Sequence, residues 1–578
     1  MPDKSAPQQG NISDRLKKLS PEKRALLDLI SSRTIINGHQ LVVQALLANG
    51  VTHIYTVSGI PVQEMLAAAV DAGIRVIGVR HQQAAVLMAI AHNYVAGRIN
   101  AIVIVSAGPA VTNVATGLLV ARDNAWPVIV IGGRRTGVAG GQDGFQELDA
   151  AELYKSITKL SRSVGEAGDI PRIINEAFGL ATTGRPGPVY LDIPEDVLRM
   201  LCTCRSVESP GSPTAKITIK QDEIDRAAAL LRNARQPAFI LGKGTRWSLV
   251  AGDLAGLIEQ HRIAFISSPM GRGILPDEHP LCFNRAKQQL QASADVVLVL
   301  GARLNWTFRF GSQINPRAKV IQVDIDPEEV KKNDKVCLGI VADAGDFVAS
   351  LRPALHEQPE NELLTARELW HTSLAAARER QRTIVEERAT SDRLPMSSYR
   401  LMKELKESIS ADTILVADGN ISMMAAQHVI PGQMPFSRFT AGTNGCMGVG
   451  IPFGIGARLG DPSRPVVIIS GDMAFGISAM ELETAVRCAV PVIVVVVNNE
   501  GISGGLMQRK LYPPGHERVT MFEPGIRYEK IAEAFGAHGE YVDHPEQLRP
   551  ALERALKSDK PTCINVSVDP YEKYMSEL

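Results

Sequence analysis

The sequence predicts an α/β protein built from three doubly wound parallel-sheet domains. Short apolar runs rich in β-branched residues alternate with longer segments of helical periodicity along nearly all of the 578 residues. Runs that are apolar throughout are typical of strands in parallel sheets that helices cover on both faces. The length also fits about three or four domains of roughly 100–200 residues each.

The predicted strands fall into three groups, separated by two polar breaks at 207–218 and 356–395, of which the second carries a highly charged helix. The clearest strands are 101–105, 127–131, 238–241, 296–300, 319–325, 413–417, 465–469 and 491–497. The sequence therefore predicts domains at 35–205, 215–355 and 390–565. An N-terminal extension, 1–34, carries a short amphipathic helix that starts near Ser20-Pro21. The tail, 566–578, is either a lid over the site or a free end.

The composition excludes several classes of protein. The chain has 62 basic and 62 acidic residues, which argues against a general nucleic-acid binder and a polybasic membrane surface. The most apolar run, 491–497, is too short to cross a bilayer, and the N-terminus lacks the apolar core of a signal peptide. Seven cysteines in so long a chain do not form a disulfide framework. We expect a cytoplasmic protein with neither nucleic acid nor membrane as a partner.

The most informative segment is 470–501. Asp472 follows one predicted strand and Asn499 ends the next, so both lie at the carboxyl ends of parallel strands, where such sheets bind ligands. Carboxylate and carbonyl oxygens suit magnesium or calcium, and such an ion would neutralise a diphosphate at a helix N-terminus. Ser478 and Glu481 have the spacing of a helix-capping box. The alternative interpretation is a strand-end acid followed by a polar turn.

The segment GDM, followed after about twenty-five residues by NN, resembles the signature of thiamine-diphosphate enzymes. The resemblance implies that Asp472, Asn499 and the carbonyl of Gly501 hold a Mg²⁺ ion that bridges the diphosphate. Met473 departs from the usual Gly-Asp-Gly, so its backbone must make the turn with a side chain present. The resemblance extends over nearly the whole chain, in the order pyrimidine-binding, middle nucleotide-binding-like and diphosphate-binding domain.

Several blocks are similar to those of 2-hydroxyacyl-CoA lyases and oxalyl-CoA decarboxylases in particular. They are AWPVIVIGG (125–133), GFQELD (144–149), PMGRGILPDEHP (269–280), GARLNWTFRFG (301–311) and IQVDIDPEE (321–329).

The resemblance assigns cofactor-binding roles in the third domain. In GTNGCMG (442–448), Met447 matches the bulky residue that wedges under the bent cofactor, and Gly445 matches the glycine whose carbonyl accepts a hydrogen bond from its 4′-amino group. Taken alone, Met447 would be interpreted as a core filler. The remaining predicted cofactor contacts are Asn420, Asp472, Met473, Ala474 and Asn499.

Gln82 is the most notable departure from the family. Its activating residue is the glutamate of Arg-His-Glu-Gln, and this chain has Arg80-His81-Gln82-Gln83. Gln82 can donate a hydrogen bond to the pyrimidine ring but cannot shuttle its proton, so activation of the cofactor should slow. Three explanations remain open: an engineered variant, a natural lineage that tolerates glutamine, and a weakly active enzyme.

Two further positions are candidates for catalysis, Glu500 and Gln146. Related acyl-CoA enzymes usually carry a neutral Asn where this chain has Glu500, which we interpret as a base near the substrate or, alternatively, as an exposed turn residue. Ser503 stands where decarboxylases tend to carry Tyr, and Phe145-Gln146 where they carry Tyr-Glu. These departures favour a lyase over a decarboxylase.

In the middle domain, Asp324 and Asp326 end the strand KVIQVDI, where an acid can accept hydrogen bonds from a ribose. In the family this domain binds flavin, ADP, the nucleotide of CoA, or nothing. Arg303 is a candidate partner for a phosphate. The alternative for Asp324 is a surface acid after a strand.

The sequence thus predicts a thiamine-diphosphate-dependent lyase that cleaves 2-hydroxyacyl-CoA, for example 2-hydroxyisobutyryl-CoA, to formyl-CoA and an aldehyde or ketone. The alternatives are an oxalyl-CoA decarboxylase, a less favoured acetohydroxyacid synthase, and a catalytically silent protein that binds cofactor or acyl-CoA. The expected cofactors are thiamine diphosphate and Mg²⁺, with ADP as an option in the middle domain. Family active sites form between subunits, so we expect Gln82 and Asp472 to meet across a dimer interface, within a homotetramer.

Overall fold

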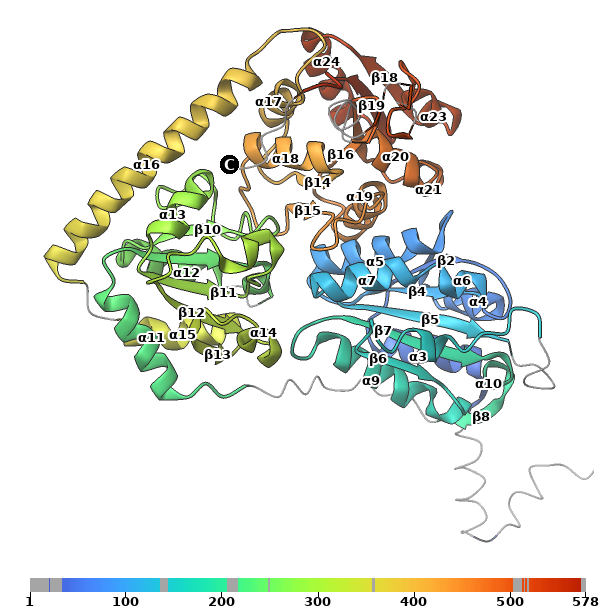
Figure 1. The fold of residues 1–578 in the computed structure, drawn as a ribbon. Coiled ribbons are helices and arrows are strands. Elements are labelled where there is room, and N and C mark those ends of the chain that lie inside the picture. The colour runs from blue at the N-terminus through green and yellow to red at the C-terminus, as the bar shows by residue number, and fades with distance from the viewer. Residues whose placement is uncertain are drawn as a thin grey trace, which may run out of the picture.

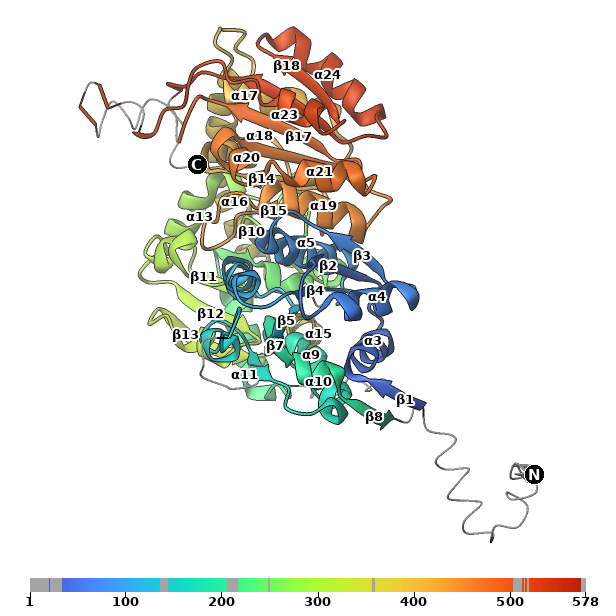
Figure 2. The ribbon, with the colours of Figure 1, turned by 90° about the vertical axis from the view of Figure 1, so that its right-hand side faces the viewer.

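The structure is a computed structural model that describes Ser20 and residues 34–572. Within that range it leaves out 136–143, 205–216, 248–249, 356–358, 503–511, 514 and 517–518. The helix predicted in the N-terminal extension therefore lies outside the described residues. Figures 1 and 2 show three α/β units, which we call the first, middle and third domains in chain order.

The first domain has a six-stranded sheet in the order β3-β2-β4-β5-β7-β6, with every pair parallel. A separate antiparallel pair, β1–β8, is an addition that the sequence did not predict. The strands are β1 (Thr34–Asn37), β2 (His53–Val57), β3 (Arg75–Gly78), β4 (Ala101–Val105), β5 (Val128–Arg134), β6 (Leu160–Ser163), β7 (Pro188–Pro194) and β8 (Leu201–Cys204). The main helices are α3 (Gly38–Ala48), α4 (Gln63–Asp71), α5 (Gln82–Ala96), α7 (Ala115–Asn124) and α9 (Ile170–Thr182).

The middle domain has a five-stranded parallel sheet in the order β10-β9-β11-β12-β13. The strands are β9 (Pro237–Leu241), β10 (Ala264–Ser267), β11 (Val296–Leu300), β12 (Lys319–Asp324) and β13 (Val336–Val341). The main helices are α11 (Gln221–Asn233), α12 (Ala251–Gln260), α13 (Lys287–Ser293), α14 (Pro327–Lys331) and α15 (Ala344–Ala354).

The third domain has a six-stranded parallel sheet in the order β15-β14-β16-β17-β19-β18. The strands are β14 (Ile414–Asp418), β15 (Arg438–Thr440), β16 (Val466–Gly471), β17 (Ile493–Asn498), β18 (His538–Val542) and β19 (Thr562–Ser567). The main helices are α17 (Ser398–Ser408), α18 (Asn420–Val429), α19 (Gly450–Gly460), α20 (Asp472–Ser478), α21 (Glu481–Arg487), α23 (Glu529–Ala534) and α24 (Pro545–Lys557).

The apolar strands lie where their sequences predict, inside the sheets. Every residue of β17 is buried, as is every residue of β4 and β11, because helices cover both faces of each sheet. Burying a Val or Ile side chain contributes about 1.5–3 kcal/mol, so these strands form the main source of stability. The predicted α/β class, with three doubly wound sheets, is confirmed.

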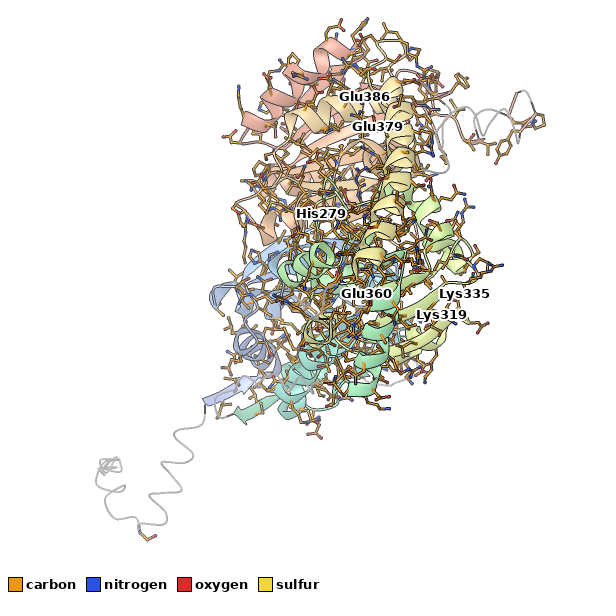
Figure 3. All side chains as sticks on the ribbon, turned by 90° about the vertical axis from the view of Figure 1, so that its left-hand side faces the viewer. His279, Lys319, Lys335, Glu360, Glu379 and Glu386 are labelled. Carbon is orange, nitrogen blue, oxygen red and sulfur yellow. The ribbon has the colours of Figure 1, made fainter. Side chains whose placement is uncertain are left out.

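A single long helix, α16 (Asn361–Ala389), connects the middle and third domains (Figure 1). Near its start, the fully buried Arg367 donates hydrogen bonds to the backbone carbonyls of Ala234, His261 and Leu231. These carbonyls lie at the C-terminal ends of α11 and α12, which leave carbonyls without intrahelical partners. At its other end, Val385 packs in the core of the third domain. The outward face of α16 carries charged residues such as Glu379 (Figure 3).

Helix α5 of the first domain packs closely against α19 of the third domain. A Cβ atom on Gly456 would overlap the backbone of Met88, and one on Gly460 would lie 2.6 Å from the carbonyl oxygen of His92. The two glycines are one turn apart on α19, so the helix presents a surface without side chains to α5. This contact fixes how the first and third domains of one chain meet.

None of the helices within the described part of the chain has the length and apolar character needed to cross a membrane.

Candidate functional site

Asp472 lies at the carboxyl edge of the third-domain sheet, where β16 ends and α20 begins. Its side chain is 2% exposed. Oδ1 accepts a hydrogen bond from the backbone N–H of Met473 at 2.7 Å, and Oδ2 accepts one from Gly501 at 2.9 Å. The carboxylate therefore joins the turn after β16 to the turn after the neighbouring strand, β17.

The structure brings the three predicted metal ligands, Asp472, Asn499 and Gly501, together at this edge. Gly471 pairs with Val497 in the register of the two strands, so the turns that follow lie side by side. Burial raises the pKa of the Asp472 carboxyl to about 7, despite hydrogen bonds from the backbone of the 499–501 turn. A bound divalent cation would offset that cost, because it favours the charged carboxylate.

The chemistry of this donor set fits Mg²⁺. Among the described residues, no cluster of three or more His, Cys, Asp or Glu side chains could hold a metal ion. A cation here would therefore depend on one carboxylate together with amide and backbone oxygens and water. That is how Mg²⁺ is usually bound next to a phosphate.

Two details of the predicted helix start are different in the structure. The helix begins at Asp472 itself, and Ser478 is its last residue, so Ser478 does not cap a helix. The following helix, α21, starts at Glu481 without a side-chain cap. Met473 replaces a glycine without strain, because it lies within the first turn of α20 and not at a position of positive φ.

The other predicted cofactor contacts surround the same edge. Asn420 is the first residue of α18, and the preceding Gly419 lies so close to Gly471 that a Cβ atom on it would be 3.4 Å from the Gly471 nitrogen. Ala474 is buried beneath the turn, at 1% exposure, so it can contribute only its backbone to a ligand. Met473 and Ala474 remain predictions as cofactor contacts.

The loop 442–448, GTNGCMG, is held at the same edge by a buried acid. Asp418, which ends β14, accepts a hydrogen bond from the backbone N–H of Gly450 at 2.6 Å. Gly445 has φ +60, a conformation that favours glycine, and Met447 is 38% exposed. An exposed methionine at this position is available to a ligand, as the resemblance implies.

Gln82 is the first residue of α5, at the carboxyl edge of the first-domain sheet. Its Oε1 accepts a hydrogen bond from the Asn113 side chain at 3.0 Å, which leaves Nε2 to donate to a ligand. Gln146 lies at the same edge, with its Cβ atom 2.8 Å from where a Cβ on Gly108 would be. Within the described residues of one chain, no hydrogen bond joins Gln82 to the third domain.

Glu500 lies in the turn between Asn499 and Gly501 and has φ +60. Its backbone N–H donates to Asn498 Oδ1 at 3.3 Å, and its carbonyl accepts from Phe522 at 2.8 Å. In the described part of the chain, its carboxylate has no ion pair. A left-handed conformation is unfavourable for a glutamate, so the turn holds the side chain in place at a cost. Ser503 lies outside the described residues.

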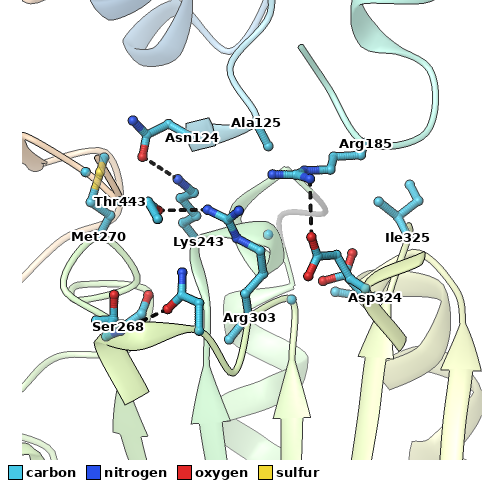
Figure 4. A pocket seen from close by; sticks show the side chains of 18 of the residues that line it. Asn124, Ala125, Arg185, Lys243, Ser268, Met270, Arg303, Asp324, Ile325 and Thr443 are labelled. Atoms are coloured by element: carbon cyan, nitrogen blue, oxygen red, sulfur yellow. Dashed lines mark hydrogen bonds and ion pairs between the residues drawn. The ribbon is translucent and has the colours of Figure 1, made fainter. Parts of the chain in front are cut away.

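The predicted nucleotide site is a cavity between the three domains (Figure 4). Arg303 and Asp324 both line it. Arg303 donates to Thr443 Oγ1 at 2.8 Å and to the carbonyl of Asp123, while burial raises the pKa of Asp324 to about 6. Asp326 does not line this cavity; it caps α14 instead.

Two further cations line this cavity, Lys243 and Arg185, and neither was predicted from the sequence. Lys243 donates to Asn124 Oδ1 at 2.8 Å, and burial, with the nearby Arg303, places the pKa of its ammonium well below the usual value (Figure 4). The segment GKG (242–244), after β9, is the signal that could have identified Lys243, since a glycine-flanked lysine after a strand is common in phosphate sites.

A second cavity, which we call the basic pocket, lies where the middle domain, α16 and the third domain meet. Five cations line it, against two acids, Asp277 and Glu278. Two buried donors that face it, Ser267 Oγ and Gln427 Nε2, have no hydrogen-bond partner among the described residues. The cations are Arg272, Arg285, Lys287, Arg378 and Lys406. They come from three separate segments of the sequence, 272–287, α16 and α17, so no single local motif could have revealed the pocket.

The described part of the predicted tail, 566–572, is held in place. Glu572 is buried and accepts hydrogen bonds from the Ser398 backbone N–H at 2.8 Å and from the hydroxyls of Ser397 and Ser398. It thus caps the N-terminus of α17, beside the carboxyl edge of the sheet. Residues 573–578 lie outside the described residues, so the proposed lid stays a prediction.

Comparisons with known proteins agree over all three domains. Three family models match: the N-terminal TPP binding domain of thiamine pyrophosphate enzymes at 36–153, the central domain at 224–351 and the C-terminal TPP binding domain at 417–566. Thiamine pyrophosphate (TPP) is another name for thiamine diphosphate.

Three relatives illustrate the similarity. The chain is 34% identical to the 2-hydroxyacyl-CoA lyase of Oryza sativa subsp. japonica, over 93% of this chain and 96% of that protein. It is 32% identical to 2-hydroxyacyl-CoA lyase 1 of Homo sapiens, over 93% and 95%. It is 35% identical to the oxalyl-CoA decarboxylase of Escherichia coli (strain K12), over 92% and 95%. Overall identity therefore does not separate the two activities.

Proposed function

The chain belongs to the thiamine pyrophosphate enzyme family, and from this premise we propose that it is a carbon–carbon lyase acting on 2-hydroxyacyl-CoA. The proposed products are formyl-CoA and an aldehyde or ketone. The observation that carries the proposal is the meeting of Asp472 with the 499–501 turn, which places Glu500 beside the predicted metal site. When bound, the cofactor supplies an electron sink for the charge that cleavage leaves behind.

The residues of the chain have separate proposed roles. Asp472, Asn499 and the Gly501 carbonyl hold Mg²⁺ and thereby the diphosphate, while Asn420, Gly445 and Met447 orient the cofactor. Gln82 is proposed to donate a hydrogen bond from Nε2 to the pyrimidine ring of the cofactor, since its oxygen already accepts one from Asn113.

Glu500 is the proposed base. Its carboxylate takes the proton of the substrate 2-hydroxyl as the adjacent carbon–carbon bond breaks. Gln146, at the edge of the first domain, is proposed to orient the substrate through its amide. Decarboxylases tend to carry Glu at this place, so the neutral amide of Gln146 departs from their pattern and supports a lyase.

The acyl-CoA substrate is proposed to use the basic pocket for its phosphates. The pocket offers a net excess of cations and two unpaired donors, Ser267 Oγ and Gln427 Nε2, to a polyanion. Helix α18 runs from Asn420 at the predicted cofactor site to His428, which lines the pocket. At 1.5 Å per residue, the distance between these two residues is about 12 Å, a separation that the extended arm of a CoA thioester can span.

The cavity between the domains is the proposed site for ADP. Lys243, Arg185 and Arg303 suit its diphosphate, and Asp324 suits a ribose hydroxyl. Isothermal titration with ADP tests this assignment: Lys243→Met should abolish binding there without changing the affinity for CoA.

Parallel assays separate the two leading activities. The protein, loaded with thiamine diphosphate and Mg²⁺, is given 2-hydroxyisobutyryl-CoA in one assay and oxalyl-CoA in the other. We expect acetone and formyl-CoA from the first and little carbon dioxide from the second. Turnover of oxalyl-CoA alone would instead identify a decarboxylase.

Gln82 stands where the family has its activating glutamate, and this difference supports a second candidate, a protein that binds cofactor or acyl-CoA without turnover. Gln82→Glu restores the family residue and should raise turnover strongly if the chain is an enzyme. Continued silence in both assays, with the cofactor demonstrably bound, would favour the binding protein.

The assembly and location are part of the proposal. Gln82 and Gln146 lie on the first domain and Asp472 on the third, without a described contact between them, which supports a site shared by two subunits. The tetramer is proposed from the family resemblance alone. Sedimentation that gives a monomeric mass would contradict this assembly.

The six cysteines with described side chains are free thiols, which supports the proposed cytoplasmic location.

A further inference from the structure

Glu481 is a buried acid to which the proposed chemistry gives no role. Its side chain is 2% exposed, and it is the first residue of α21. Helix α20, which begins at Asp472, leads into α21 through only Ala479 and Met480. Glu481 is therefore firmly connected to the predicted metal site of its own chain.

The carboxylate of Glu481 reaches across to the first domain. Oε1 accepts hydrogen bonds from the backbone N–H of Arg80 at 3.1 Å and of His81 at 3.0 Å. Oε2 accepts from Thr484 Oγ1, on its own helix, at 2.7 Å. A buried carboxylate is costly unless hydrogen bonds satisfy it, and these three do so. The contact is thus a specific link between two domains.

The two backbone N–H groups that Glu481 holds come directly before Gln82. His81 is the N-cap of α5, and its side chain accepts a hydrogen bond from Gln83 at 3.1 Å. The hydrogen bonds from these two N–H groups to Glu481, which we call the strut, therefore fix the point at which α5 starts, and with it the backbone of Gln82. Asn113 then fixes the side-chain amide.

We propose that Glu481 is a positioning residue that sets Gln82 for its hydrogen bond to the cofactor. Within each chain, the third domain would then align the residue that the first domain offers to the cofactor of the partner subunit. This inference rests on the proposed function for the role of Gln82. It assigns to Glu481 no contact with substrate or cofactor.

The domain contact itself does not depend on Glu481. Arg487 Nη2 donates to the Gly78 carbonyl at 2.7 Å, and Arg75 Nη2 donates to the Cys488 carbonyl at 3.1 Å. The packing of α5 on α19 adds to these contacts. Replacing Glu481 by glutamine, which has the same size, should therefore release the 80–81 backbone without separating the domains.

Hydrogen exchange tests the strut directly. In Glu481→Gln, the side chain loses its negative charge, which weakens both bonds to Oε1, and an amide nitrogen in the place of Oε2 cannot accept the Arg80 N–H, which also lies 3.3 Å from Oε2. We expect faster amide exchange in the peptide 78–83, with an unchanged melting temperature. Glu553→Gln makes the same charge change at an exposed position on α24, away from this contact, and should leave exchange in that peptide as it is. Unchanged exchange in Glu481→Gln would overturn the proposal.

The affinity for thiamine diphosphate tests the action through Gln82. Calorimetry in excess Mg²⁺ should show binding about tenfold weaker in Glu481→Gln, since small misplacements of a positioned group have effects of this size or larger. In a Gln82→Ala background there is no side-chain amide to position, so Glu481→Gln should not weaken the binding of thiamine diphosphate further. An equal loss in both backgrounds would mean that Glu481 does not act through Gln82.

A milder variant covers the case in which Glu481→Gln does not fold. Thr484→Val removes only the hydroxyl that orients the carboxylate, and we expect a smaller loss of affinity with the same dependence on Gln82. If Thr484→Val leaves the affinity for thiamine diphosphate unchanged in the chain that retains Gln82, this result would count against the proposal. None of these measurements uses an acyl-CoA, so their outcome does not depend on whether the chain cleaves 2-hydroxyacyl-CoA.

Discussion

Asp472 and Gly501 are joined by a hydrogen bond of 2.9 Å from the glycine N–H to the carboxylate Oδ2. The bond connects the turns after two neighbouring strands, β16 and β17, and so determines where Asn499 and Glu500 lie. A buried carboxylate with two backbone donors and no cation is unfavourable in its charged form. The same arrangement becomes favourable when a divalent cation binds.

Asp472→Asn should therefore abolish metal-dependent binding without harming the fold. We expect thiamine diphosphate to bind at least about a hundredfold more weakly in the presence of Mg²⁺, since loss of a direct ligand should exceed the 10–100-fold typical of outer-sphere partners. The melting temperature without metal should change little, because removing the buried charge offsets the loss of one acceptor for a backbone N–H. Titration calorimetry and circular dichroism measure the two effects. Asp559→Asn, at an exposed site, is the control, and tight binding by Asp472→Asn would contradict the assignment.

Glu500→Gln should lower kcat for 2-hydroxyacyl-CoA with little change in KM. A general base typically contributes about 10²–10⁴-fold, and glutamine retains the size of the side chain but cannot take the proton. Steady-state kinetics with saturating substrate measures the effect, with Glu553→Gln as a remote control. Full activity in Glu500→Gln would remove Glu500 from the mechanism.

Gly456→Ala should weaken the contact between the first and third domains. The added methyl would overlap the backbone of Met88 on α5, and overpacking of this kind typically costs about 1–3 kcal/mol. Gly256→Ala, on α12, is a matched control, because nothing lies within 4 Å of its Cβ. Helix propensity should make that control neutral or up to about 1 kcal/mol more stable. Equal unfolding free energies in the two variants would contradict the close contact.

Arg367→Met should destabilise the protein by about 3 kcal/mol or more. The substitution leaves buried carbonyls at the ends of α11 and α12 without donors, and each unsatisfied group costs about 1–3 kcal/mol. Arg380→Met, on an exposed part of α16, should have little effect. Denaturant unfolding compares the two variants. If they unfold alike, the guanidinium does not anchor α16.

Asp192 gives a prediction about pH. Its side chain is 1% exposed, Arg134 lies 3.7 Å away, and burial raises the pKa of its carboxyl to about 7. A raised pKa means that the folded state holds its proton more tightly, so this contribution to stability is present at low pH and is lost as the pH rises through about 7. Asp192→Asn cannot ionise and should not show the loss.

The difference in unfolding free energy between Asp192→Asn and the wild type should therefore grow in favour of the variant by about 3 kcal/mol from pH 5 to pH 8. Thermal unfolding at several pH values measures it. The comparison isolates Asp192 because all other groups are common to both proteins. A constant difference across this range would show that Asp192 keeps its ordinary pKa.

Local sequence patterns were sufficient for the sheets and for the third-domain edge. Continuous apolar runs such as 491–497 have one favourable environment, and Asp472 and Asn499 follow directly from the ends of two such strands. The antiparallel pair β1–β8 could not be predicted, because its partners, such as Ile36 and Cys202, are separated in the sequence by the whole first domain. Neither could the basic pocket, whose cations come from distant elements, nor the strut from Glu481 to His81. The prediction that Ser478 caps a helix was wrong. The spacing of Ser478 and Glu481 matches a capping box, but the hydrogen bonds of Asp472 start the helix six residues earlier.

Helix α16 fixes the rotation of the middle domain relative to the third domain as well as the distance between them. Arg367 fixes one end to the middle domain and Val385 the other to the third domain, so the rotational phase of 29 helical residues is fixed at both ends. One inserted residue would turn one anchor relative to the other by about 100°, whereas seven would bring it back to within about 20°. The distance between the two domains can therefore change over evolutionary time only in steps of about whole helical turns of α16. A helical connection thus allows fewer lengths than a flexible linker would.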